Sequence, residues 1–202
     1  MFIIYSGVIL KPNNNLFNDK EYTSIMRLFI STSFNEFSGY FESLQNQLPK
    51  AKHTLPKEFH LTLKFLGEVD ENKAEKIKEK LAEIKFKPFE CEINGIGNFG
   101  GNFVKVVFVR IINSEKMVEL QKQIDGKLAD FFKKEKGFEP HLTIARVKFA
   151  ENKKDYIEAL KKIKTEKQAK KVNSFELIKS TLTPKGPVYE VLGAYKAIQQ
   201  PL

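Results

Sequence analysis

The sequence has few of the residues that define several functional classes. It contains one cysteine (Cys91), no tryptophan and only three histidines among 202 residues. A single cysteine excludes an internal disulfide framework and any site that needs several cysteine ligands, such as an iron–sulfur cluster. We therefore expect a reducing, cytoplasmic location and interpret Cys91 as a small buried or edge residue.

Arginine is also scarce, although the chain is basic. Lysine and arginine together number 34 against 25 acidic residues, a formal net charge of +9, and only three of the basic residues are arginines. Lysine suits long-range attraction, whereas arginine binds phosphate in a fixed bidentate geometry. This charge fits an anionic partner, nucleic acid first, and it equally fits a solvated lysine-coated surface.

Long apolar runs are missing as well. Phe2–Leu10 is an apolar run of nine residues, whereas a membrane-spanning helix needs about 20. No basic residue precedes this run and no small-residue cleavage site is evident, so we expect neither a membrane span nor a secretory signal. We interpret residues 1–25 as an N-terminal extension, either an extra edge strand or a segment outside the fold, and residues 26–202 as a single domain.

The remaining chain alternates strand-like and helix-like segments. Asp70 and Ser114 occupy predicted helix N-caps, and two further helices begin near residues 35 and 155. The strand patterns lie at 27–34, 59–66, 89–99, 102–112 and 140–149, followed by a pair around the turn 183–187 that ends near 197. Hairpins mixed with helices predict an α+β fold with antiparallel sheets.

One short motif occurs twice. The pattern His-Leu-Thr-aliphatic begins at His60 and again at His141, in two predicted strands. Because side chains alternate along a strand, His60 shares a face with Thr62, and His141 shares a face with Thr143. The same alternation places Leu61, Leu63 and Phe65 together on the opposite face of the first strand. Each strand therefore offers an imidazole beside a hydroxyl.

Two such pairs across a cleft suit in-line displacement at phosphorus. One neutral histidine accepts a proton from the attacking oxygen, and a charged one protonates the leaving oxygen. The threonine hydroxyls donate hydrogen bonds to the non-bridging oxygens. This scheme needs no metal, and no carboxylate cluster lies near the motifs. The alternative is that both histidines are ordinary strand residues, but the repetition favours a functional role. His53 lacks the motif and is interpreted as a surface residue.

These segments resemble a known family. His60–Gly67 (HLTLKFLG) and His141–Arg146 (HLTIAR) resemble the two signatures of the two-histidine phosphoesterase superfamily. The nearest resemblance within it is to the RNA 2′,3′-cyclic phosphodiesterases, also called 2′-5′ RNA ligase-like proteins. Ser180–Tyr189 is similar to that family's C-terminal segment, and the resemblance extends over about 26–197. It implies a bilobal α+β fold with two pseudo-symmetric antiparallel-sheet lobes and outer helices, in which each lobe supplies one His-x-Thr strand to a central groove.

The resemblance also implies an activity. The expected reaction is hydrolysis of an RNA 2′,3′-cyclic phosphate end to a 2′-phosphate, without metal or cofactor, by a monomer. It makes His60 the acid, His141 the base, and Thr62 and Thr143 ligands of the phosphate oxygens. Two alternatives are reversible formation of a 2′-5′ linkage and non-catalytic binding of RNA ends.

Two other candidate site residues have two interpretations each. Strict alternation places Arg146 on the face opposite His141, from where it either reaches the phosphate at the strand end or pairs with an acidic neighbour. Tyr189 either stacks on a base or belongs to the core.

Overall fold

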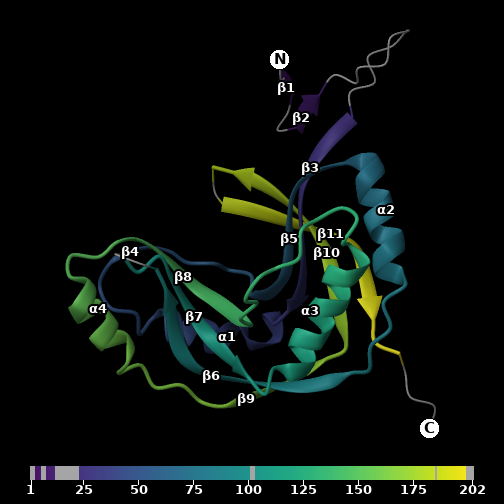
Figure 1. Cartoon of the computed structure of the whole chain (residues 1–202). Helices are drawn as coiled ribbons and strands as arrows, with labels where there is room; N and C mark the ends of the chain where they lie inside the picture. Colours follow the sequence, from purple (N-terminus) through teal and green to yellow (C-terminus); the bar gives the residue numbers. More distant parts are fainter. Residues whose placement is uncertain (1–2, 6–7, 12–22, 101–102, 185, 199–202) are drawn as a thin grey trace, which may run out of the picture.

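The strands form two antiparallel sheets, as the sequence predicts (Figure 1). The computed structural model describes residues 3–5, 8–11, 23–100, 103–184 and 186–198. The first sheet contains β1 (Ile3–Tyr5), β2 (Val8–Lys11), β3 (Thr23–Ser33), β10 (Ser174–Thr183) and β11 (Gly186–Lys196) in that order, with β5 (His60–Asp70) paired to β3. The second has the order β4 (Lys52–Thr54), β8 (His141–Phe149), β7 (Val106–Ile112), β6 (Phe89–Phe99) and β9 (Gln168–Val172).

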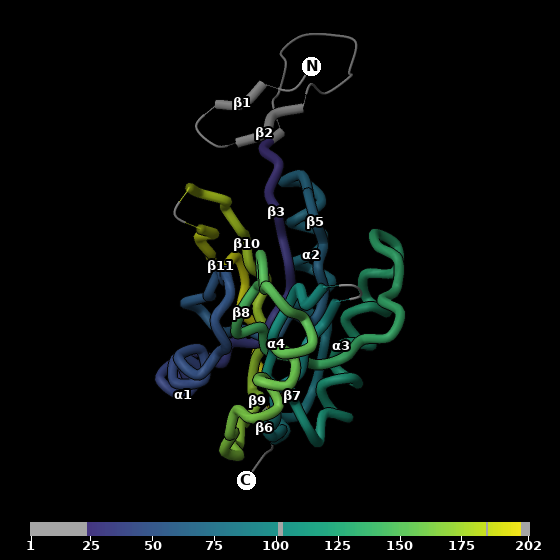
Figure 2. Tube along the Cα trace, turned by 90° about the vertical axis from the view of Figure 1, so that its left-hand side faces the viewer, coloured from purple at the N-terminus to yellow at the C-terminus, as the bar shows by residue number. Residues whose placement is uncertain are grey.

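Four α-helices in the described residues pack on the outside of the strands. Two of them, α2 (Glu71–Ala82) and α3 (Glu115–Lys127), pack against the first sheet. On the second sheet, α1 (Ser38–Gln45) follows a short 3-10 helix (Asn35–Phe37) and contacts β8, and α4 (Lys153–Leu160) lies at the β4 end (Figure 1). Figure 2 shows the strands between α1 on one side and α3 on the other. The fold is therefore bilobal α+β, as the resemblance implies.

The two motif strands occupy equivalent places in this fold. β5 is followed directly by α2, and β8 is followed by α4, so each lobe contains a motif strand with a helix after it. β5 and β8 also contact each other where the two sheets meet. Their alternate residues Leu61, Leu63, Leu142 and Ile144 are buried in one continuous core. The apolar side of each motif strand thus anchors the polar side.

Both predicted residues occupy helix N-caps, but only one of them makes a capping hydrogen bond. The Asp70 side chain accepts a hydrogen bond from the Lys73 backbone N–H at 2.8 Å, as an N-cap residue should. Ser114 also occupies the predicted N-cap position, before α3, but its side chain makes no capping hydrogen bond. The difference is conformational, because Asp70 is extended (φ −75°, ψ 162°) whereas Ser114 is not (φ −101°, ψ 10°).

Several strand predictions also need correction. β5 continues past Gly67 to Asp70, because the positive φ of Gly67 (+73°) lets the strand pass an irregularity in its pairing with β3. The short edge strands β4 and β9 lie in segments that were not expected to pair. His53, interpreted as a surface residue, is half-buried on β4 with Nε2 2.8 Å from the Tyr156 hydroxyl.

The N-terminal segment is described only in part. β2 pairs antiparallel with β3 in the register Ile9↔Ile25, and β1 pairs with β2. This pairing agrees with the edge-strand interpretation for residues 3–5 and 8–11, while residues 12–22 lie outside the described residues. No helix among the described residues is long and apolar enough to cross a membrane.

Candidate active site

His60 lies at the first position of β5 and contacts two aromatic rings, which also contact each other. The Phe29 ring from β3 lies 4.9 Å from it, centroid to centroid, and the Tyr189 ring from β11 lies 5.2 Å away, nearly perpendicular. Burial and, to a smaller extent, the positive charge of Arg146 together lower the pKa of His60 to about 4. The imidazole is therefore neutral at neutral pH in the absence of ligand.

His141 has the equivalent environment on β8. The Phe99 ring from β6 lies 4.8 Å from it at 90°, and the Phe108 ring from β7 lies 5.3 Å away. Its Nδ1 is 2.8 Å from the backbone oxygen of Glu139. A carbonyl oxygen only accepts, so Nδ1 carries the hydrogen and Nε2 is left to exchange a proton with a ligand.

Thr62 and Thr143 lie where strand alternation predicts. Both are half-buried, as the histidines are, whereas Leu61 and Leu142 between them are fully buried. Thr62 is paired with Ser31 of β3, and Thr143 with Phe108 of β7. Each strand thus presents an imidazole and a hydroxyl on the face away from the core.

Both motif strands contain a β-bulge at the same motif position. In β5 the pairing with β3 skips Leu63, and in β8 the pairing with β7 skips Ile144, so the fourth residue of each motif has no partner in register. A bulge puts two residues opposite one and inverts the alternation that follows. The residue after it is consequently buried in both strands: Lys64 and Ala145.

The bulges correct two sequence predictions. Phe65 was expected on the buried side but is 49% exposed, and it pairs with Phe29, which contacts His60. Because directly opposed residues share a face, Phe65 lies on the His60 face of β5. Arg146, the equivalent residue of β8, was expected opposite His141, yet its charge acts on both His60 and Tyr189.

Arg146 therefore links the two motifs. It belongs to the second motif, and the histidine whose pKa it lowers belongs to the first. Burial raises the pKa of the Tyr189 hydroxyl, and the same guanidinium partly opposes that rise. The structure thus brings His60, Arg146 and Tyr189 together, with Tyr189 beside the histidine rather than in the core.

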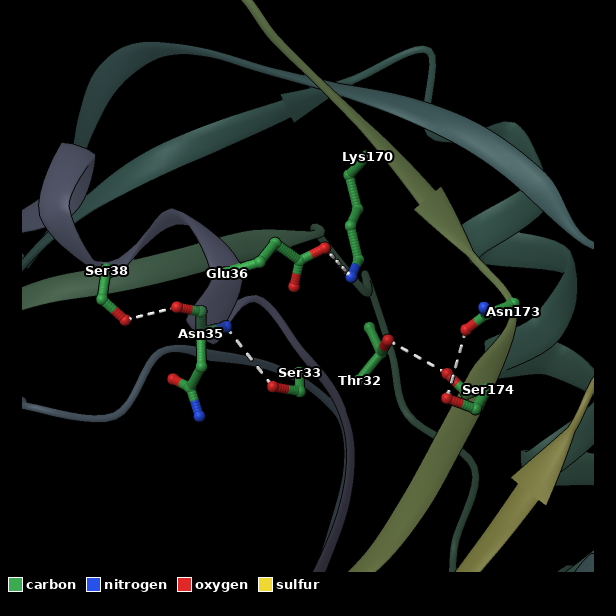
Figure 3. A network of polar contacts seen from close by, with 8 residues as sticks. All are labelled: Thr32, Ser33, Asn35, Glu36, Ser38, Lys170, Asn173 and Ser174. Atoms are coloured by element: carbon green, nitrogen blue, oxygen red, sulfur yellow. Dashed lines mark hydrogen bonds and ion pairs between the residues drawn. The ribbon is translucent and has the colours of Figure 1, made fainter.

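Hydrogen bonds fix the backbone that leads into His60. The Phe59 N–H donates to Asn35 Oδ1 at 2.6 Å, and the Asn35 N–H donates to Ser33 Oγ at 3.4 Å. Ser33 is paired with His60 across the sheet. Figure 3 shows Ser33 and Asn35 beside the Glu36–Lys170 ion pair and the hydrogen bond from Thr32 to the Ser174 backbone oxygen. The bonds of Asn35 hold the 3-10 helix between β3 and the start of β5, while the contacts of Glu36 and Thr32 join the helix to β9 and β3 to β10.

The sequence did not reveal the aromatic residues that contact the two motif histidines. Phe29, Phe99 and Phe108 all contact a motif histidine, and Arg27 lies 5.0 Å above the Phe65 ring. These residues come from other strands, and nothing in the spacing of the 18 phenylalanines distinguishes them from core residues. Among the described residues, no three His, Cys, Asp or Glu side chains are grouped so as to hold a metal ion.

The fold and the paired motifs define a two-histidine phosphoesterase. A family model described as the 2′-5′ RNA ligase superfamily matches residues 35–182. A protein of Methanocaldococcus jannaschii named RNA 2′,3′-cyclic phosphodiesterase is 41% identical over 177 residues, which is 83% of this chain and 98% of the relative. One of Thermotoga maritima with the same name is 34% identical over 176 residues, 83% and 93% of the two chains. The chain therefore belongs to the RNA 2′,3′-cyclic phosphodiesterase family of this superfamily.

Solved structures agree with the fold. The TT0787 protein of Thermus thermophilus matches with a TM-score of 0.68 and 25% identity, covering 85% of this chain and 97% of that one. The apo form of LigT from E. coli matches with a TM-score of 0.71 at 19% identity, covering 87% and 99%.

Proposed function

We propose that this protein is an RNA 2′,3′-cyclic phosphodiesterase that opens the cyclic phosphate to a 2′-phosphate. The observation that carries the proposal is the effect of Arg146, in the second motif, on His60, in the first. A histidine close to a cation from the other motif strand, which also carries a second histidine, matches the needs of displacement at a phosphate anion. The names of the relatives supply the substrate class.

The reaction uses both histidines as proton carriers. His141, with Nδ1 held by the Glu139 oxygen, accepts a water proton at Nε2 while the water oxygen bonds to phosphorus. The bond from phosphorus to the 3′ oxygen breaks, and His60 gives its proton to that oxygen. Since the two histidines accomplish both transfers, we propose that the reaction needs neither metal nor cofactor.

His60 needs its proton only when substrate is bound. In the free protein, burial and the charge of Arg146 together keep the pKa of His60 near 4. A phosphate anion beside Arg146 offsets that charge and directly favours the imidazolium, so the pKa of His60 rises on binding. Substrate binding thus favours the protonated form of His60, which is the form that acts as the acid.

The remaining site residues bind the substrate. Thr62 and Thr143 donate hydrogen bonds to the non-bridging oxygens, and Arg146 stabilises their charge. Tyr189 packs edge-on against His60 and stacks on the base next to the cyclic phosphate. We further propose that the protein is a cytoplasmic monomer, with 26–202 as one domain, in accord with a single buried cysteine and an RNA substrate.

Turnover of a short oligonucleotide ending in a 2′,3′-cyclic phosphate tests the proposal. With a chelator present, the wild type should release a 2′-phosphate, whereas His60→Ala and His141→Ala should each lose about 100-fold or more in kcat. The control is His53→Ala, because His53 contacts Tyr156 and not the site, and it should turn over normally. Unchanged turnover in either motif variant would falsify the mechanism, and tight binding without turnover would assign the protein to the end-binding class.

Ligation is the second candidate, because the matching family model is described as a 2′-5′ RNA ligase superfamily. It is the same chemistry with a 5′ hydroxyl in place of water, and the two histidines exchange roles in the reverse direction. Adding an acceptor oligonucleotide with a free 5′ hydroxyl to the same assay detects it. A 2′-5′ linked product that depends on both histidines would establish ligation.

A further inference from the structure

Gln45, the last residue of α1, connects the two motifs. Its Nε2 donates one hydrogen bond to the Pro56 backbone oxygen at 2.9 Å and another to the Ile144 backbone oxygen at 3.0 Å. Pro56 lies four residues before His60, and Ile144 is the bulged residue of the second motif. Both N–H groups of one side-chain amide are therefore used to join the segment before His60 to the bulge after Thr143.

Lys64 makes the reciprocal connection. It follows the bulged Leu63 of the first motif, and its Nζ forms an ion pair with Asp125 of α3 and donates to the Lys133 backbone oxygen at 2.9 Å. Asp125 also accepts from the Glu135 N–H at 2.9 Å. Residues 133–135 belong to the segment that leads into His141.

The Lys64 connection is buried, and both carboxylate oxygens of Asp125 accept hydrogen bonds. Lys64 is 2% exposed, and the second Asp125 oxygen also accepts from Gln121 Nε2 at 2.8 Å. Although burial by itself raises the pKa of Asp125, the hydrogen bonds from Lys64, the Glu135 N–H and Gln121 leave that pKa below its usual value. A buried ion pair is a weak source of net stability but tolerates little displacement, so it holds the 133–135 segment at a defined position.

The two connections cross. The bulge of each motif is tied to the segment that precedes the histidine of the other: Ile144 to Pro56 through Gln45, and the Leu63–Lys64 bulge to 133–135. We propose that Gln45 is a positioning residue that, together with the Lys64–Asp125 pair, sets His60 relative to His141 for proton transfer. This inference rests on the proposed function of the two histidines.

The fold explains why the histidines need these two connections, which we call the brace: Gln45 and the Lys64–Asp125 pair. The histidines lie on different sheets, so no ladder of strand hydrogen bonds runs from one to the other. Acid and base must act on opposite sides of one phosphorus atom, and a misplacement of about 1 Å costs roughly 100-fold in rate. The brace touches no substrate atom in this scheme, so its loss should affect kcat and leave substrate binding largely intact.

Steady-state kinetics of Gln45→Met on the cyclic-phosphate oligonucleotide test the inference. Methionine keeps the length of the side chain and removes both donors, so we expect kcat to fall at least about tenfold with KM changed less than about twofold. The matched control is Gln47→Met, because Gln47 is exposed, lies just after the end of α1, and its side chain donates to the Ser43 backbone oxygen of that helix. It should behave as wild type. Gln45→Lys restores N–H donors at this position and should recover most of kcat.

Any of the following results would overturn the inference. One is wild-type kcat in Gln45→Met, a second is an equal loss in Gln47→Met, and the third is a loss in Gln45→Met that appears in KM alone. Thermal unfolding of the same variants is measured alongside. A fall in kcat that simply follows lost folded protein, with no recovery in Gln45→Lys, also counts against a positioning role.

A second readout separates this inference from the proposed function. NMR titration of the His60 ring needs no turnover. Because Arg146 on β8 depresses the pKa of His60 on β5, loosening the brace should raise that pKa in Gln45→Met and leave it unchanged in Gln47→Met. If the wild type lacks cyclic-phosphate turnover, the proposed function fails, and an unaltered His60 titration in Gln45→Met then overturns the brace independently.

Discussion

At the scale of a single residue, the charge of Arg146 contributes to the protonation state of His60. It carries a permanent positive charge close enough to act on His60 and Tyr189. In the free protein this charge opposes protonation of His60, and a phosphate anion bound beside it would offset that effect. Arg146 therefore adds to the effect of burial in keeping His60 neutral in the free protein.

Replacing that charge should change the His60 titration in a defined direction. In Arg146→Gln the pKa of His60 should rise from about 4 but remain below its ordinary value of 6.5, because burial is the larger cause of the depression. Proton NMR of the imidazole ring across pH 3–8 measures it. Arg110→Gln is the control, since the Arg110 guanidinium donates to the Ile96 oxygen and does not contribute to the shift. An identical His60 titration in wild type and Arg146→Gln would contradict this account.

At the scale of the strand, close packing between β6 and β7 shapes the wall behind His141. Gly97 of β6 is directly opposite Phe108 of β7, and the Phe108 ring covers the glycine so closely that a Cβ added there would lie 2.4 Å from a ring carbon. The same ring contacts His141. The absence of a side chain at Gly97 is therefore required for Phe108 to occupy its place.

A methyl group at position 97 should displace the Phe108 ring. We expect Gly97→Ala to destabilise the protein by about 1–3 kcal/mol through overpacking and to lower kcat, because Phe108 must move away from its contact with His141. Gly126→Ala is the control: it lies in α3 with no atom within 4 Å of its added Cβ, and it should stabilise by about 0.5–1 kcal/mol. Thermal unfolding and steady-state kinetics measure both, and wild-type values for Gly97→Ala would refute the packing argument.

The elements themselves were largely predictable from residue pattern. The cap predicted at Asp70 located the start of α2, and the strand pattern at Phe89–Phe99 matches β6. The short strands β4 and β9 were missed because three to five residues carry little periodicity, and their pairing depends on the neighbouring strand. Ser114 shows the same limit for caps, since a suitable residue type does not ensure an extended conformation.

Charge acts at the scale of the whole molecule. The net charge of +9 resides in residues 26–202, because the four charged side chains of residues 1–25 cancel: Lys11, Asp19, Lys20 and Glu21. Lysine supplies nearly all of it, which suits sequence-tolerant attraction of an anionic RNA end to the site.

A shortened chain tests this distribution of charge. A protein that begins at Met26 should keep its turnover, and its KM for the oligonucleotide should rise with salt as steeply as that of the full chain, because screening acts on the same charges. Kinetics of both chains between about 50 and 200 mM salt give the two slopes. A flatter salt dependence in the shortened chain would assign part of the attraction to residues 1–25.

The sequence by itself determined the chemistry of this protein, and the tertiary structure decided how the parts of the site meet. The repeated His-x-Thr motif indicated two proton carriers and two hydroxyl donors, because alternation over three residues needs only local backbone geometry. The positions of Arg146 and Phe65 depend on bulges, which arise from register with β7 and β3 and leave no local pattern. The low pKa of His60 likewise comes from burial and from a charge on another sheet. Such properties exist only once distant strands have packed together.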